Sequence, residues 1–201
     1  MKTINNFIIE KLRLSTAKTY TCQPKTIDEL KEILEERLER DNNANLNDID
    51  VSEITDMAYL FDGLDPHNID ISKWDVSNVT NMRFMFLGCT NFNSDLSKWD
   101  VSNVELMNFM FYECNKFNSD LSKWDVSRVK NMCNMFYDCQ NFNSDLSKWN
   151  VSKVKNMLEM FGECSNFNSD LSNWDVSNVA NMNYMFTNCT SLKNKPNWYN
   201  G

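Results

Sequence analysis

Glycine, proline and histidine are scarce in this chain: its 201 residues include four glycines, three prolines and a single histidine, His67. So few glycines leave little backbone for a phosphate-binding loop. Neither a Gly-x-Ser-x-Gly nor a His-Glu-x-x-His motif is present, and these are the motifs that would indicate a serine hydrolase or a zinc protease. We therefore expect a protein that is not an enzyme and that uses no cofactor.

Positive charge is also in short supply. Lysine and arginine number 20 against 28 acidic residues, which gives a net charge of −8. The basic residues form no run, and nucleic-acid binding needs an excess of them, so we expect no nucleic-acid partner. No apolar stretch reaches the length of a membrane span. The N-terminus lacks the apolar core of a secretory signal, which predicts a cytoplasmic protein.

The cysteines do not form metal-binding pairs. The chain has seven cysteines and no Cys-x-x-Cys motif, so a metal site is not expected. Five of them recur at one spacing, and we expect these to be small buried hydrophobic residues rather than disulfide partners: Cys89, Cys114, Cys139, Cys164 and Cys189.

What the chain has in abundance is an internal repeat. The sequence Trp-Asp-Val-Ser at Trp74 returns, nearly unchanged, every 25 residues as far as Trp174. A fixed period of this size indicates one structural unit stacked on copies of itself, so that each position of the repeat forms a column. Full copies begin at Asp70, Asp95, Asp120, Asp145 and Asp170, and an incomplete copy precedes them.

Two apolar spacings occur within each unit. Met82, Met85, Phe86 and Cys89 have the spacing of one face of a short helix. Apolar residues at every second or third position over 92–104 favour short strands. The spacing therefore predicts an α/β fold: a leucine-rich-repeat-like right-handed solenoid of about six 25-residue strand-turn-helix units, with a parallel sheet backed by a row of helices.

The first 45 residues do not follow the repeat. We expect them to form an N-terminal α/β cap with an amphipathic helix through Ile4, Phe7, Ile8 and Leu12, then a strand over Lys18–Cys22. A second helix follows the capping box that begins at Thr26. A separate partner-binding head is the alternative. The predicted organisation is thus a cap over 1–45, repeats over 46–192 and a C-terminal tail over 193–201.

Columns of aspartate and tryptophan allow two interpretations each. Stacked carboxylates, such as Asp95 and Asp120, bind calcium in some repeat proteins, but those repeats place glycines beside the aspartates. We favour a structural role at turns. An exposed tryptophan column binds sugars, whereas these indoles are in phase with Val76 and Leu96 and are expected in the core.

On the outer face of the expected helices, two columns are rich in aromatic residues over the first four units. They predict a continuous aromatic strip that binds a protein partner, with self-association as a homodimer and simple exposure as alternatives. The aromatic strip consists of Tyr59, Phe84, Leu87, Phe109, Tyr112 and Tyr137.

The repeat also resembles a known family. The run from Phe92 to Val104, together with Met107, Met110, Phe111 and Cys114, is similar to the 25-residue repeat of the BspA-like leucine-rich repeat proteins, in the DUF285 or "Mycoplasma-type" branch found in bacterial surface proteins. The resemblance implies a leucine-rich-repeat-like fold and a role in protein or host-surface recognition.

The function we expect is a non-catalytic protein-binding scaffold that docks its partner on the aromatic strip or on the sheet face. The alternative is a bacterial surface adhesin or glycan-binding protein. A calcium-loaded structural rod is a third class.

Overall fold

A computed structural model describes residues 19–200, so the first helix expected, through Ile4 and Leu12, lies outside the described residues. Within them there is one helix, α2, at Ile27–Arg40. No β-strand is formed in this range. Seven isolated parallel bridges take the place of strands, and six of them join residues 25 positions apart.

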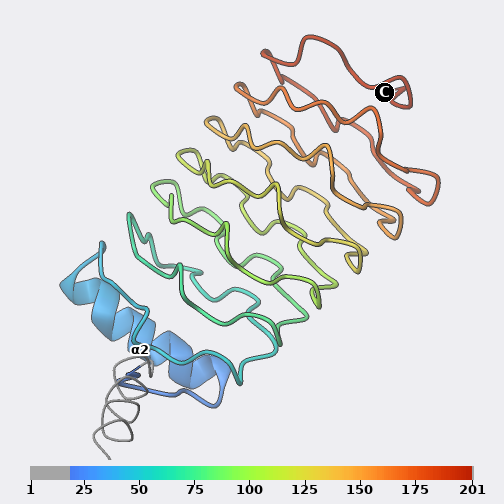
Figure 1. The fold of residues 1–201 in the computed structure, drawn as a ribbon. Helices are drawn as coiled ribbons and strands as arrows, with labels where there is room; N and C mark the ends of the chain where they lie inside the picture. The colour runs from blue at the N-terminus through green and yellow to red at the C-terminus, as the bar shows by residue number, and fades with distance from the viewer. Residues whose placement is uncertain (1–18, 201) are drawn as a thin grey trace, which may run out of the picture.

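Helix α2 covers the first coil of the repeat. Thr26 is its N-cap, since its side chain accepts a hydrogen bond of 3.2 Å from the backbone N–H of Glu29. Leu30, Leu34 and Leu38 recur on one face of the helix and are buried. α2 lies at one end of the molecule (Figure 1), and its three leucines belong to the hydrophobic core there.

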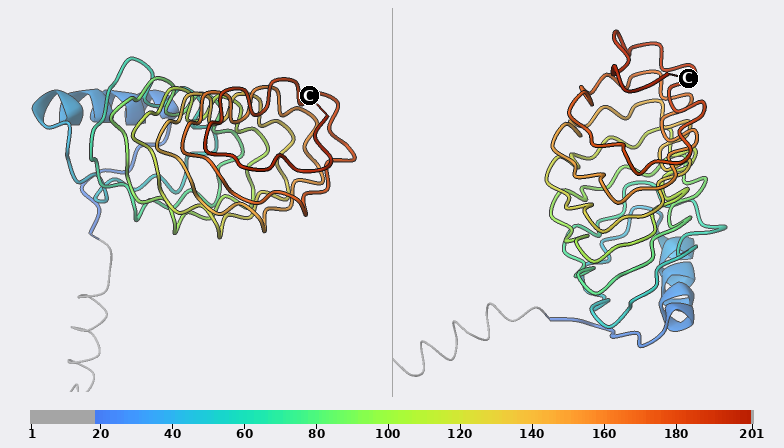
Figure 2. Two further views of the ribbon diagram at one scale, coloured as in Figure 1. Left: turned by 90° about the horizontal axis from the view of Figure 1, so that it is seen from above. Right: turned by 90° about the vertical axis from the view of Figure 1, so that its right-hand side faces the viewer.

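Residues 41–200 form a stack of coils, most of which are 25 residues long. Alternate backbone N–H groups donate to carbonyl groups of the next coil, as from Phe109 to Cys133 (2.9 Å) and from Phe111 to Met135 (2.9 Å). Figures 1 and 2 show the coils lying one on another in chain order, from α2 to the C-terminus. Equivalent residues of successive coils therefore form the columns that the period predicts.

The helix expected in each unit is absent, and this part of the fold prediction was wrong. Between Met82 and Cys89 the backbone makes consecutive tight turns, in which Met85 donates to Met82, Leu87 to Phe84 and Cys89 to Phe86. These bonds span three residues rather than the four of an α-helix. Phe84 has φ 57°, a left-handed conformation that a right-handed helix cannot contain.

The expected strands are absent as well. Over 92–104 the chain turns repeatedly, with Trp99 donating to Leu96 and Val104 to Val101. The units are therefore not strand-turn-helix units, and the fold is not the α/β solenoid predicted. Residues 19–200 form no sheet face on which a partner could dock. The apolar spacing marked which residues are buried, but consecutive turns bury residues at the same intervals as a helix.

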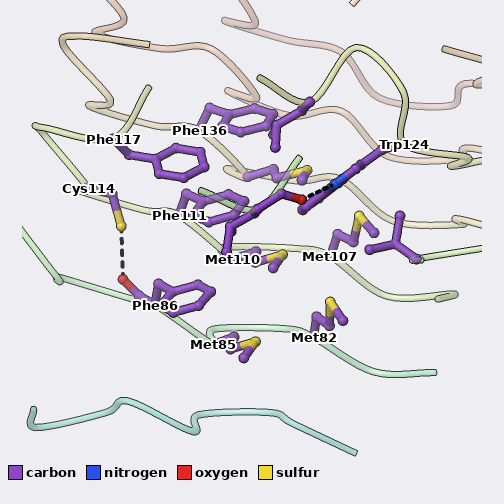
Figure 3. Packing of buried hydrophobic residues seen from close by; sticks show 14 of the residues in the cluster. Met82, Met85, Phe86, Met107, Met110, Phe111, Cys114, Phe117, Trp124 and Phe136 are labelled. Carbon is purple, nitrogen blue, oxygen red and sulfur yellow. Dashed lines mark hydrogen bonds between the residues drawn. The ribbon is translucent and has the colours of Figure 1, made fainter. Parts of the chain in front are cut away.

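The core consists of columns of identical side chains. The phenylalanine column from Phe61 to Phe186 stacks with ring centroids 5.0–5.8 Å apart, and its rings are at most 3 % exposed. The tryptophan column is 4 % exposed from Trp74 to Trp174. Figure 3 shows Phe86, Phe111 and Phe136 in successive coils with methionines beside them. Burial of this kind, about 25 cal/mol for each Å² of apolar surface, stabilises the stack.

At the C-terminal end, aromatic residues extend the columns. Trp198 stacks on Trp174 at 6.4 Å and donates from its indole nitrogen to the carbonyl oxygen of Leu171 (3.0 Å). Tyr199 packs edge-on against Phe186 at 5.0 Å. These two residues therefore cover part of the last coil.

Candidate functional site

The structure brings the rings of the aromatic strip together. Ring centroids of Tyr59 and Phe84 lie 4.5 Å apart, and those of Phe84 and Phe109 lie 4.8 Å apart, nearly parallel in both pairs. Tyr112 then contacts Phe109 at 5.6 Å and Tyr137 at 5.0 Å. Five rings in four coils thus form an unbroken series of contacts.

The strip lies on consecutive turns rather than on the outer face of a helix. All six of its residues are half-buried, so each ring keeps one part against its neighbours and another part open to solvent. Leu87 is the one residue of the strip without a ring, so it does not extend the stack.

The strip ends sharply at the fifth coil. There Gly162 occupies the column of Tyr137, and a Cβ atom on Gly162 would meet the ring of Tyr137 at 2.9 Å. Asn134 and Glu159 replace the phenylalanines in the other column. Tyr184 returns an aromatic ring to that column in the last coil, where it is 64 % exposed.

Three aromatic residues of the strip have left-handed backbone. Tyr59, Phe84 and Phe109 have φ values of 57°, 57° and 58°. Asparagine and glycine adopt this conformation most easily, and a bulky side chain there is an outlier. Asn134, at the equivalent position, has φ 53°. The turns therefore form with asparagine, and a large ring is not needed to build them.

Negative charge surrounds the C-terminal part of the strip, at Tyr112 and Tyr137. Burial raises the pKa of the Tyr137 hydroxyl, and four nearby carboxylates raise it further: Glu163, Glu159, Asp138 and Glu113. Within residues 19–200, no lysine or arginine forms a salt bridge with any of the four. The rings of Tyr112 and Tyr137 thus lie in a locally negative field.

The aspartate columns are used at turns. Asp95 accepts a hydrogen bond of 2.9 Å from the backbone N–H of Ser97, and Asp125 accepts one of 3.0 Å from Ser127. Hydrogen bonds from the side chain and then from the backbone N–H of each serine hold the pKa of the carboxyl group below its usual value. Among the described residues, no group of three or more His, Cys, Asp or Glu side chains is placed to hold a metal ion.

Cysteine and tryptophan columns connect each coil to the one before it. The Sγ of Cys114 lies 3.0 Å from the carbonyl oxygen of Phe86, to which the thiol donates, and the indole nitrogen of Trp124 donates to Leu96 at 3.0 Å (Figure 3). Burial raises the pKa of the Cys89 thiol to about 12. Such thiols stay protonated at neutral pH and are poor nucleophiles.

Comparison with known protein families gives a match over most of the chain. The family is described as "Mycoplasma protein of unknown function, DUF285", and its model matches residues 29–135 and 119–200. The chain belongs to this family. The match confirms the DUF285 branch of the resemblance, and the family's description assigns no activity.

No curated protein and no solved structure matches this DUF285 chain. Among its described residues, no helix combines the length and the apolar character needed to cross a bilayer.

Sequence reasoning missed one charged group in this DUF285 protein. Four basic residues gather in two adjacent coils as two pairs that are 25 positions apart along the chain, and we call them the basic patch: Arg128, Lys130, Lys153 and Lys155. Reading the repeat by columns would have found them, because residues 25 apart lie on neighbouring coils.

Proposed function

We propose that this protein is a non-catalytic scaffold that binds a protein partner on the aromatic strip. The observation that carries the proposal is the unbroken series of ring contacts from Tyr59 to Tyr137. Contiguous apolar surface that remains partly open is typical of interaction sites, and tyrosine and phenylalanine are enriched at the centres of interfaces.

Backbone conformation supports the same proposal. A left-handed residue other than glycine costs on the order of 1–3 kcal/mol, and such residues cluster at functional sites. Phe84 and Phe109 have this conformation although asparagine, as at Asn134, would adopt it at a lower energetic cost. Ring stacking offsets part of that cost. A role in binding explains why rings are retained there.

The charges around the strip define the chemistry of the partner. Glu113, Asp138 and Glu163 follow the tyrosine column, and each lacks a basic partner within residues 19–200. A segment that alternates apolar side chains with lysine or arginine would cover the rings and neutralise the carboxylates. Its cations would also gain from the faces of Tyr112 and Tyr137. We therefore expect the partner to present a basic, partly apolar segment.

The test immobilises the wild type and two variants and exposes each to a lysate of the source organism. The proteins that bind to each are then quantified by mass spectrometry. The strip variant carries Phe84→Asn, Phe109→Asn and Tyr112→Thr, which are residues that the repeat already uses at Asn134 and Thr187. The control is Tyr184→Ala, which removes an exposed ring outside the strip.

A partner of the strip is enriched by the wild type and by Tyr184→Ala, and lost by the strip variant. That partner must then bind the purified wild-type protein directly and lose at least tenfold in affinity for the strip variant. If the strip variant retains every partner while remaining folded, the proposal is wrong. Recovery of glycans in place of a protein would contradict it as well.

A further inference from the structure

The basic patch is a concentration of positive charge on a protein whose net charge is −8. Arg128 and Lys153 share one column, and Lys130 and Lys155 share another column two residues further on. Lys155 donates its backbone N–H to the carbonyl oxygen of Lys130 at 2.9 Å, so the two columns stay in register and four cations occupy adjacent positions on two coils.

Other coils do not carry cations at these positions. The column of Arg128 contains Glu53, Asn78, Asn103 and Asn178, and the column of Lys130 contains Thr55, Thr80, Glu105 and Ala180. The repeat therefore folds with neutral or acidic residues there. Like charges directly opposite each other on neighbouring rungs destabilise the pairing, so the fold itself gives no reason for the cluster.

Two carboxylates, Glu105 and Asp125, offset only part of this charge. The pKa of Asp125 is lowered mainly by its hydrogen bonds to Ser127, and further by the charges of Arg128 and Lys153. Glu105 forms a salt bridge of 2.5 Å with Lys130, and both side chains are about half exposed. The pKa of Glu105 is lowered mainly by its hydrogen bond to Lys130, and then by the charges of Lys130, Arg128 and Lys153. Within residues 19–200, neither Lys153 nor Lys155 forms a salt bridge.

The aspartate column loses its charge at the same coil. Asn150 replaces the aspartate of the other full repeats. Its Oδ1 still accepts hydrogen bonds from the N–H of Ser152 (3.2 Å) and from the hydroxyl group of that residue (2.7 Å). The turn is thus preserved while the carboxylate three residues before Lys153 is removed, which leaves the patch more positive.

A shallow pocket of about 280 Å³ lies within the patch. It is lined by Lys130, Ser152, Lys153, Lys155 and Asn178. The lysine stems supply apolar walls, and the ammonium groups of the three lysines supply donors. This combination suits a carboxylate on a short apolar stem.

We infer that the basic patch binds an acidic peptide segment of a protein partner, at a site separate from the aromatic strip. A single exposed ion pair contributes only about 0–1 kcal/mol, so one free anion gains little from solvent-exposed lysines. Several carboxylates on one chain engage several lysines at once, and each further contact forms at a high effective concentration. A long polyanion such as nucleic acid would meet repulsion from the acidic surface beyond the patch.

The test is a fluorescence-anisotropy titration of labelled hexaglutamate with the full chain. The patch variant is Lys153→Gln with Lys155→Gln. A matched control, Lys98→Gln with Lys123→Gln, removes the same charge from another column of exposed lysines. We expect about tenfold weaker binding by the patch variant, which corresponds to about 1.4 kcal/mol, and less than a twofold change for the control. The strip variant should bind the peptide as the wild type does.

Three results would overturn the inference. Equal weakening by the two lysine variants would show that only net charge matters. If the wild type does not bind hexaglutamate at low salt, the basic patch is not a peptide-binding site. Displacement of the peptide by inorganic phosphate, or by a single-stranded oligonucleotide of equal charge, at the peptide's own concentration would assign the patch to a different ligand.

Discussion

The indole nitrogen of Trp124 donates a 3.0 Å hydrogen bond to the carbonyl oxygen of Leu96 in the preceding coil. The same bond recurs from Trp74 to Leu46 and from Trp149 to Leu121. Each indole therefore fills the interior of its own coil and satisfies a buried carbonyl group of the coil before it. A column that does both explains why tryptophan repeats so strictly.

Trp124→Phe should lower the free energy of unfolding by about 1–3 kcal/mol. The substitution removes one of the two donors to the buried carbonyl oxygen of Leu96, which still accepts a hydrogen bond from the backbone N–H of Trp99. That loss costs about 0.5–1.5 kcal/mol, and part of the indole volume is left empty. Urea denaturation followed by circular dichroism measures the change.

Trp198→Phe is the matched control for Trp124→Phe. Its bond to Leu171 is only part-buried, so water can replace the lost donor and the expected loss is smaller. Equal losses at the two positions would show that the bond to the preceding coil is not what tryptophan contributes.

The aspartate columns predict a difference between asparagine and alanine. Asp95→Asn should keep the bond to Ser97 and leave stability at neutral pH nearly unchanged, because Asn45, in the same column, accepts the equivalent bond from the backbone N–H of Asn47 (3.0 Å). Asp95→Ala should lose about 1 kcal/mol.

The Asp95 substitutions also predict a pH dependence. The pKa of Asp95 is lowered by its hydrogen bonds to Ser97, so its contribution is present above the pKa of the unfolded chain and is lost as the pH falls through the folded value. The gap between wild type and Asp95→Asn should therefore change only below about pH 4. A change that begins near neutral pH would contradict this explanation.

The cysteine column predicts loss of stability in alkali. Burial raises the pKa of the Cys139 thiol well above its ordinary value of 9.0. Above about pH 9 the unfolded chain loses thiol protons that the folded chain keeps. The free energy of unfolding should then fall as the pH rises, by up to about 1.4 kcal/mol per pH unit for each such thiol.

Cys139→Ser isolates this effect, because a hydroxyl group can still donate to the Phe111 carbonyl oxygen but does not ionise in this range. Urea titrations from pH 7 to 10.5, a range set by about the ordinary thiol pKa, should show a shallower decline for the variant above pH 9. Parallel curves for the two proteins would mean that Cys139 ionises in the folded state.

The period of the sequence predicted the columns but not the backbone. Because equivalent residues stack whatever their local structure, Phe84 and Phe109 were correctly expected to be neighbours. The prediction of a helix from Met82 to Cys89 was wrong, because consecutive turns bury apolar residues at the same spacing as a helix. The sign of φ is not encoded in that spacing, although glycine at Gly88 and asparagine at Asn134 were indications of left-handed residues.

The two candidate sites differed in how readily the sequence revealed them. Aromatic residues in an acidic chain were conspicuous, and the aromatic strip could be named from two columns. The lysines of the basic patch look scattered in linear order, and Lys130 and Lys155 become neighbours only when the columns are read across coils. The missing carboxylate at Asn150 likewise becomes noticeable only when the aspartate column is compared across coils.

Left-handed backbone gives the last prediction, which is a stabilising substitution. Glu159 has φ 51°, and its column contains Asn134 at φ 53° in the coil before it. Asparagine tolerates this conformation better than glutamate, because its short polar side chain can hydrogen-bond locally. Glu159→Asn should therefore raise the free energy of unfolding by about 0.5–1 kcal/mol.

The control for Glu159→Asn is Glu53→Asn, at an exposed position that is not among the residues of positive φ. This substitution removes an exposed salt bridge with Lys25, which contributes only about 0–1 kcal/mol, so no gain in stability is expected from it. Urea midpoints of the two variants and the wild type decide the question. A gain confined to Glu159→Asn would show that the strain is real, and would imply that the phenylalanines of the aromatic strip carry the same cost. If Glu159→Asn is neutral or destabilising, the strain argument for the strip fails, and only the ring stacking and the surrounding charge remain in its support.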